Sequence, residues 1–134
     1  MGSVLVVGGW VELQSDEAVS AWRKKKLAMA KLSGWGGPIA APEAGSAFDR
    51  WSIDELWQNA REAPEAIEIV ESGRGVRFAA ALSSVTGRAL WAPALLAAVR
   101  RAAGLGQGAA WASYVSETPG VLAASASGRG SFRE

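Results

Sequence analysis

The hydrophobic residues of this chain follow two periods that alternate along its length. Over 4–13 the chain is rich in β-branched residues, which is typical of a strand, and the pair Gly8-Gly9 indicates a bulge or a close approach to the backbone. Over 16–33 the apolar residues recur at helical spacing, and Ser15 precedes them as a suitable N-cap. We therefore expect a strand over 4–13 and a helix over 16–33.

The middle of the chain contains the clearest helix start. Ser52 and Glu55 have the spacing of a capping box, and apolar residues follow at helical spacing until Pro64. This pattern predicts a helix over 53–63. The preceding segment, 34–47, contains several glycines and two prolines and is predicted to be a loop.

Alternation of period two follows this helix. Apolar and polar residues alternate on both sides of a turn at 72–75, which predicts a β-hairpin over 67–82. A short helix over 64–72 is the alternative for the first arm, because proline is favoured in the first helical turn.

The last third of the chain predicts one more helix and one more hairpin. The helix is expected over 92–103, with Pro93 in its first turn. The hairpin is expected over 109–116 and 121–126, because Glu117-Thr118-Pro119-Gly120 has the residues of a type II turn.

The order of these elements defines a fold class. Two hairpins and an N-terminal strand without regular βαβ alternation predict an α+β fold, in which a small, mostly antiparallel sheet carries about three helices. We expect one domain over 1–126 and a polar tail over 127–134.

Composition narrows the chemistry. The chain has seven tryptophans but neither histidine nor cysteine, so the residues most used as bases, nucleophiles and transition-metal ligands are missing. We predict no catalytic, cofactor-binding or metal-binding residue, and no enzymatic activity. The chain has no apolar run long enough for a membrane span and no recognisable signal peptide, which favours a soluble, intracellular or virion protein without membrane contact.

Charge is arranged in zones. The segment 23–31 carries five cations, including Arg23, Lys24, Lys25 and Lys26, whereas 43–71 carries eight acids and two arginines. The net charge is only +1. Such zones predict ion pairs within the chain or head-to-tail contacts between copies.

The tryptophans fall into two groups. Trp22 and Trp57 lie on predicted apolar helix faces, and Trp111 alternates within a predicted strand. Trp51 precedes the N-cap Ser52 and is expected to pack on the first turn of the helix as a hydrophobic staple. All four are expected in the core. The other three lie beside glycine or proline at the ends of predicted elements, where a large side chain is suited to an interface. The interface candidates are Trp35, Trp10, Trp91, Arg23, Lys24, Lys25, Lys26, Phe132 and Arg133.

These features favour contact over catalysis. The hypothesis is a non-enzymatic structural subunit of a larger oligomeric assembly, which contacts copies of itself and other subunits. Its concrete form is a phage virion component of the neck, tail or capsid.

Two other functions stay open from the sequence. The first is a nucleic-acid-associated accessory protein that uses the basic helix around 23–31. The second is a small enzyme or ligand-binding domain that works through carboxylates, with Asp49 and the glutamates of 62–71 as candidates.

Overall fold

Five strands form one antiparallel sheet, which is the frame of the protein. The computed structural model describes residues 3–32, 35, 39, 42, 45–116 and 124–132. The strand order is β2-β3-β1-β4-β5, and every neighbouring pair is antiparallel. The strands are β1 (Ser3–Leu13), β2 (Ala66–Ser72), β3 (Gly75–Leu82), β4 (Gly106–Ser116) and β5 (Ala124–Phe132).

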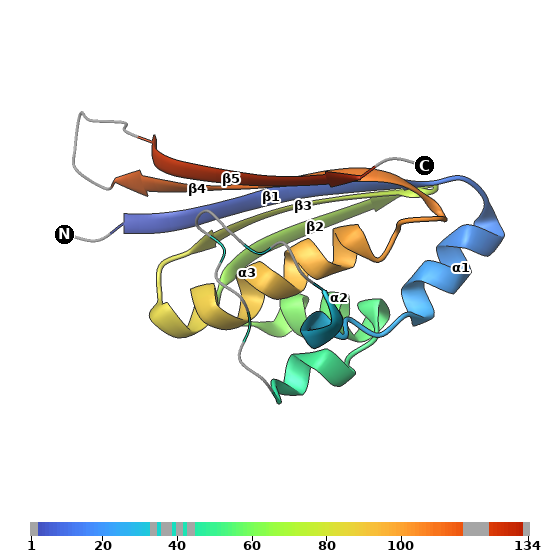
Figure 1. Ribbon diagram of the computed structural model, residues 1–134, viewed down its shortest axis with the longest axis horizontal. Coiled ribbons are helices and arrows are strands. Elements are labelled where there is room, and N and C mark those ends of the chain that lie inside the picture. Colours follow the sequence, from blue (N-terminus) through green and yellow to red (C-terminus); the bar gives the residue numbers. More distant parts are fainter. Residues whose placement is uncertain are drawn as a thin grey trace.

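Three helices lie on one side of this sheet (Figure 1). They are α1 (Asp16–Lys24), α2 (Ile53–Glu62) and α3 (Val85–Arg100). The predicted α+β fold, with an N-terminal strand, two hairpins and about three helices, is confirmed. The first arm of the first hairpin is strand β2, so the alternative helix over 64–72 is wrong.

Helix α2 forms as the sequence predicts. The Ser52 hydroxyl accepts a hydrogen bond from the Glu55 N–H at 3.1 Å, and the Glu55 carboxylate accepts one from the Ser52 N–H at 3.0 Å. Both bonds of the capping box are therefore present, and they satisfy N–H groups that a helix start leaves without partners.

Helix α1 is shorter than predicted, because it ends at Lys24 instead of continuing to 33. The chain turns extended at Lys25 and pairs with the segment before α2. The Leu27 N–H donates to the Trp51 carbonyl at 2.9 Å, and the Ile53 N–H donates to the Lys25 carbonyl at 3.0 Å. These long-range bonds replace the next helical turn.

Helix α3 was predicted too short at its start. It begins after Ser84, whose hydroxyl accepts from the Gly87 N–H at 2.8 Å, and not at residue 92. Pro93 lies inside the helix and not in its first turn. Proline removes the bond to the carbonyl of Ala89, and Ala89 is exposed, so water can hydrate that carbonyl.

The C-terminal hairpin extends beyond its prediction. Strand β4 starts at Gly106, and β5 covers 124–132, so the predicted boundary between domain and tail falls inside a strand. Phe132 pairs through its backbone with Gly108. The predicted turn at 117–120 and Arg133 lie outside the described residues.

The core lies between the helices and one face of the sheet. Trp22 and Trp57 are its largest buried side chains, with ring centroids 6.0 Å apart. The Trp22 indole N–H donates to the carbonyl of Ala98 at 2.9 Å, near the end of α3. The indole N–H of Trp57 is also buried, but it has no hydrogen-bond partner among the described residues. The two core tryptophans therefore differ by one hydrogen bond.

This difference predicts unequal costs for the same substitution. Trp22→Phe and Trp57→Phe each remove one ring from a buried site, but only Trp22→Phe leaves a buried carbonyl unpaired. We expect Trp22→Phe to lower the free energy of unfolding by about 1–2 kcal/mol more than Trp57→Phe. Urea denaturation of both variants measures the difference, and equal losses would contradict it.

Candidate functional site

The face of the sheet opposite the helices carries no described element (Figure 1). Side chains alternate along each strand, so the residues between the core positions lie on this face, which we call the open face. Register aligns them in rows across the strands. On the four strands β2, β3, β1 and β4 they are Ala66, Glu68, Val70, Ser72, Gly75, Arg77, Ala79, Ala81, Val4, Val6, Gly8, Trp10, Glu12, Gln107, Ala109, Trp111, Ser113 and Val115.

Most of the exposed large apolar side chains gather on the open face. Four are exposed among the described residues, and three of them, Trp111 at 47%, Val70 at 41% and Trp10 at 36%, lie there. The fourth, Val85, is at the start of α3. Exposed apolar side chains that gather on one face, next to exposed alanines, are typical of interaction surfaces.

Trp111 was predicted in the core, and this prediction is wrong. Its neighbours Ala110 and Ala112 face the helices and are buried, so the indole lies on the other face of β4. There it covers Gly8, its register partner on β1. A Cβ atom at Gly8 would collide with the indole ring. The predicted close approach at the glycine pair is thus present, whereas β1 pairs without a bulge on both sides.

Gly9 makes the same allowance on the opposite face. A Cβ atom there would lie 2.5 Å from Cζ of Phe78 and 2.9 Å from the carbonyl oxygen of Ala109. One glycine therefore admits an aromatic ring on the open face, and the next admits one in the core.

Shallow hollows follow strands β2 and β3 on the open face. One of about 490 Å³ is lined by small residues that include Val6, Ala66, Ala79 and Ala81. A second of about 380 Å³ lies beside Trp10, Val70 and Arg77, and one of about 240 Å³ lies between Glu68 and Arg77.

Two side chains of opposite charge, Glu68 and Arg77, line these hollows. Glu68 lies opposite Ala79, and Arg77 lies opposite Val70, so the two form a diagonal pair on neighbouring strands. Both are exposed. Neither takes part in an ion pair among the described residues. The open face thus combines apolar side chains with the exposed charges of Glu68 and Arg77 and, two rows away from Glu68, of Glu12.

The predicted interface tryptophans are in three different places. Trp10 lies on the open face. Trp35 is half-buried against the core, with its ring 5.9 Å from the guanidinium of Arg100. Trp91 is buried on α3 and offers no surface to a partner, with its ring 4.9 Å from that of Phe48. The error for Trp91 follows from the late start predicted for α3.

Trp51 was predicted in the core and is half-buried at its edge. Its ring stacks on that of Phe48, with centroids 4.1 Å apart. It lies 6.0 Å from the ring of Trp91. These three rings form an aromatic cluster beside α3.

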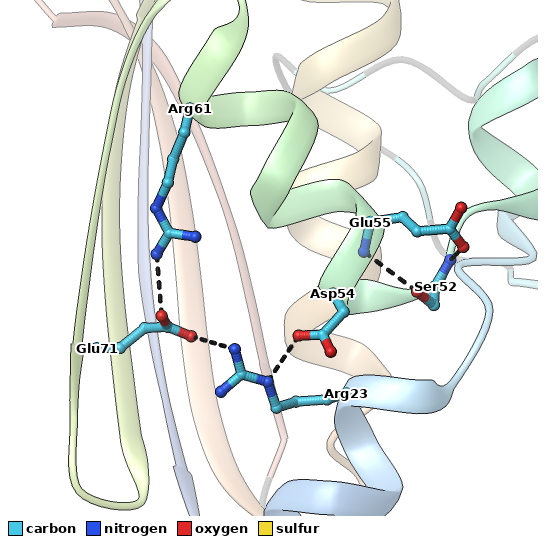
Figure 2. Close-up of polar contacts among 6 residues, drawn as sticks. All are labelled: Arg23, Ser52, Asp54, Glu55, Arg61 and Glu71. Atoms are coloured by element: carbon cyan, nitrogen blue, oxygen red, sulfur yellow. Dashed lines mark hydrogen bonds and ion pairs between the residues drawn. The ribbon is translucent and has the colours of Figure 1, made fainter.

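The basic run is partly neutralised by acids of the same chain. Figure 2 shows Arg23 between Asp54 and Glu71, at 2.7 and 2.9 Å, and Arg61 on the other oxygen of Glu71 at 2.9 Å. This network connects α1, α2 and β2. The predicted internal pairing of charge zones is present here. Lys24, Lys25 and Lys26 are exposed, and Lys26 Nζ lies 3.7 Å from the carboxylate of Glu55.

The shifted pKa values have local causes on the helix side of the molecule. The hydrogen bond with Asp54 raises the pKa of Arg23. The backbone hydrogen bond from Ser52 lowers the pKa of Glu55, which stabilises its charged form at the helix start. Burial lowers the pKa of Arg101, whose guanidinium donates to the carbonyls of Leu27 and Ala28 at 3.0 and 2.9 Å. All three groups support the fold.

The carboxylates proposed for catalysis are mostly engaged in structural contacts. Asp49 accepts from the N–H of Met29 at 2.7 Å, and Glu65 accepts from the Ser84 hydroxyl at 2.9 Å. Glu68 lines a hollow. The nearest open-face acid on β1, Glu12, is about 17 Å away by strand spacing, which is too far for a glycosidase pair.

Comparisons with known proteins do not relate this chain to a family. No family model, curated protein or solved structure matches it. No helix among the described residues is long and apolar enough to cross a membrane. The site is therefore argued from its own residues.

Sequence reasoning missed the residues of β3 that share the open face with Trp10. Arg77, Ala79 and Ala81 alternate with Val76, Phe78 and Ala80 in β3. That alternation assigns one set to each face, but it does not say whether a second layer covers the more polar one. The small side chains that shape the large hollow gave no signal of their own.

The glycine pair predicts a contrast between the two faces. Gly8→Ala displaces a half-exposed indole that can move, so we expect it to lower the free energy of unfolding by less than about 1 kcal/mol. In a Trp111→Ala background, Gly8→Ala is expected to cost nothing. Gly9→Ala forces a methyl against buried Phe78 and backbone, and we expect a loss of about 2 kcal/mol or more. Urea denaturation compares the variants. If Gly8→Ala is the costlier one, the indole of Trp111 does not move aside as this account expects.

Proposed function

We propose that this protein is a non-enzymatic structural subunit of a larger oligomeric assembly, and that it contacts its neighbour through the open face of the sheet. The observation that carries the proposal is the gathering of Trp10, Val70 and Trp111 on that face. Tryptophan is the residue most enriched among those that dominate binding energy at protein interfaces. A phage neck, tail or capsid subunit is one protein of this class.

The open face is large enough for a specific contact. Five strands at about 4.8 Å spacing give a width of about 24 Å, and strands of this length run about 24–37 Å. The resulting area of about 700 Å² is comparable with the roughly 800 Å² that each partner buries in a standard interface. Burial there also removes an exposed apolar surface from water.

The geometry gives less support to the other two functions. The basic helix predicted around 23–31 for nucleic-acid binding does not form, because α1 ends at Lys24, and Arg23 already binds two carboxylates. Catalysis would require Asp49 or an acid of 62–71 to face a second group, but Asp49, Glu65 and Glu71 are held in contacts within the chain.

Association through the open face is tested by measuring the molar mass of the protein in solution. We expect the wild-type protein to increase in mass with concentration in light scattering. Ala79→Glu, which puts a carboxylate at the centre of the open face, is expected to remain monomeric with unchanged circular dichroism, because a carboxylate is costly to bury against the apolar side chains of a partner.

Val85→Glu is the matched control, since it makes a similar apolar-to-acid change at an exposed side chain on α3. It is expected to associate like the wild type. A wild-type protein that stays monomeric at high concentration would contradict the proposed function.

A further inference from the structure

We infer that the partner on the open face is a second copy of this chain, related by a two-fold axis that places Arg77 of each copy beside Glu68 of the other. The inference rests on the proposed function and specifies its geometry. Its basis is that the open face is complementary to itself in charge and in shape.

The charge argument starts from the diagonal pair. Glu68 and Arg77 are exposed on neighbouring strands, and neither has an ion-pair partner among the described residues. Consider a two-fold axis that lies between two facing sheets, perpendicular to the line from Glu68 to Arg77 and level with its midpoint. Rotation about this axis puts Arg77 of one copy opposite Glu68 of the other. Both charges of one copy then meet opposite charges of the other, and a two-fold interface makes this contact twice.

The same axis keeps the two open faces over each other. Strands lie about 4.8 Å apart, and alternate residues of one strand lie about 6.8 Å apart. On this grid the rotation moves the centre of the sheet by only about 3 Å, so the two open faces overlap over most of their area. The charged pair therefore does not confine the contact to one edge.

Shape supports the same arrangement. On the grid, the rotation carries Trp10 over the space between Ala66 and Ala81 of the other copy. That space belongs to the hollow of about 490 Å³. It also carries Trp111 onto Val6. Each exposed indole thus meets small or apolar side chains.

The test uses reciprocal charge changes in the full chain. Glu68→Arg places a second cation beside Arg77, and Arg77→Glu places a second anion beside Glu68, so each variant alone faces like charges across the axis of the dimer. We expect each change to raise the dissociation constant of the dimer at least about tenfold in analytical ultracentrifugation.

Mixing the two variants restores both pairs, because every cation then faces an anion. We expect the equimolar mixture to form heterodimers with a dissociation constant within about tenfold of the wild type. Recovery on mixing also shows that each variant is folded. Glu62→Arg, at an exposed acid of α2, is the control and leaves the wild-type dimer unchanged.

The outcomes separate this inference from the proposed function. If the wild type associates but neither charge change weakens it, or the mixture does not recover, the two-fold pairing is overturned and the proposed function stands. If the wild type is monomeric at all concentrations, both are overturned. Loss in each variant with recovery in the mixture supports the pairing.

Discussion

Hydrophobic burial between one face of the sheet and three helices holds this protein together, and the same arrangement leaves the other face uncovered. Leu5, Val7 and Val11 of β1 point into the core, whereas Val6, Gly8 and Trp10 lie on the open face. All described helices are on the core side (Figure 1). Whatever covers the open face must therefore come from outside the described residues.

The middle of β1 connects the two faces. Gly8 admits the indole of Trp111 on the open face, and Gly9 admits the ring of Phe78 in the core. The central strand is thus thin at the point where aromatic rings approach it from both sides. Core packing and the shape of the open face therefore both depend on the two neighbouring glycines.

Local signals were sufficient to predict much of the fold. The capping box at Ser52 and Glu55 located the start of α2, and the alternation over 67–82 located the first hairpin, because both patterns act between near neighbours. The α+β class followed from the order of such elements. These are features in which sequence spacing and structure correspond directly.

The errors have non-local causes. Helix α1 ends early because Leu27 and Ile53 form backbone bonds with distant segments. Helix α3 tolerates Pro93, which the sequence pattern placed in a first turn. Trp111 was wrongly assigned to the core because its strand carries apolar side chains on both faces. Alternation alone does not say which face the helices cover. The proximity of Glu68, Arg77 and Trp10 follows only from the register of the three strands β2, β3 and β1.

The most direct test of association through the open face is the accessibility of individual tryptophans as the protein concentration rises. In hydroxyl-radical labelling read by mass spectrometry, we expect Trp10 and Trp111 to be labelled in dilute protein and protected in concentrated protein. Trp35 and Trp51, half-buried against the core, are expected to keep the same labelling. Labelling of Trp10 and Trp111 that does not change while the mass of the protein increases would contradict the account.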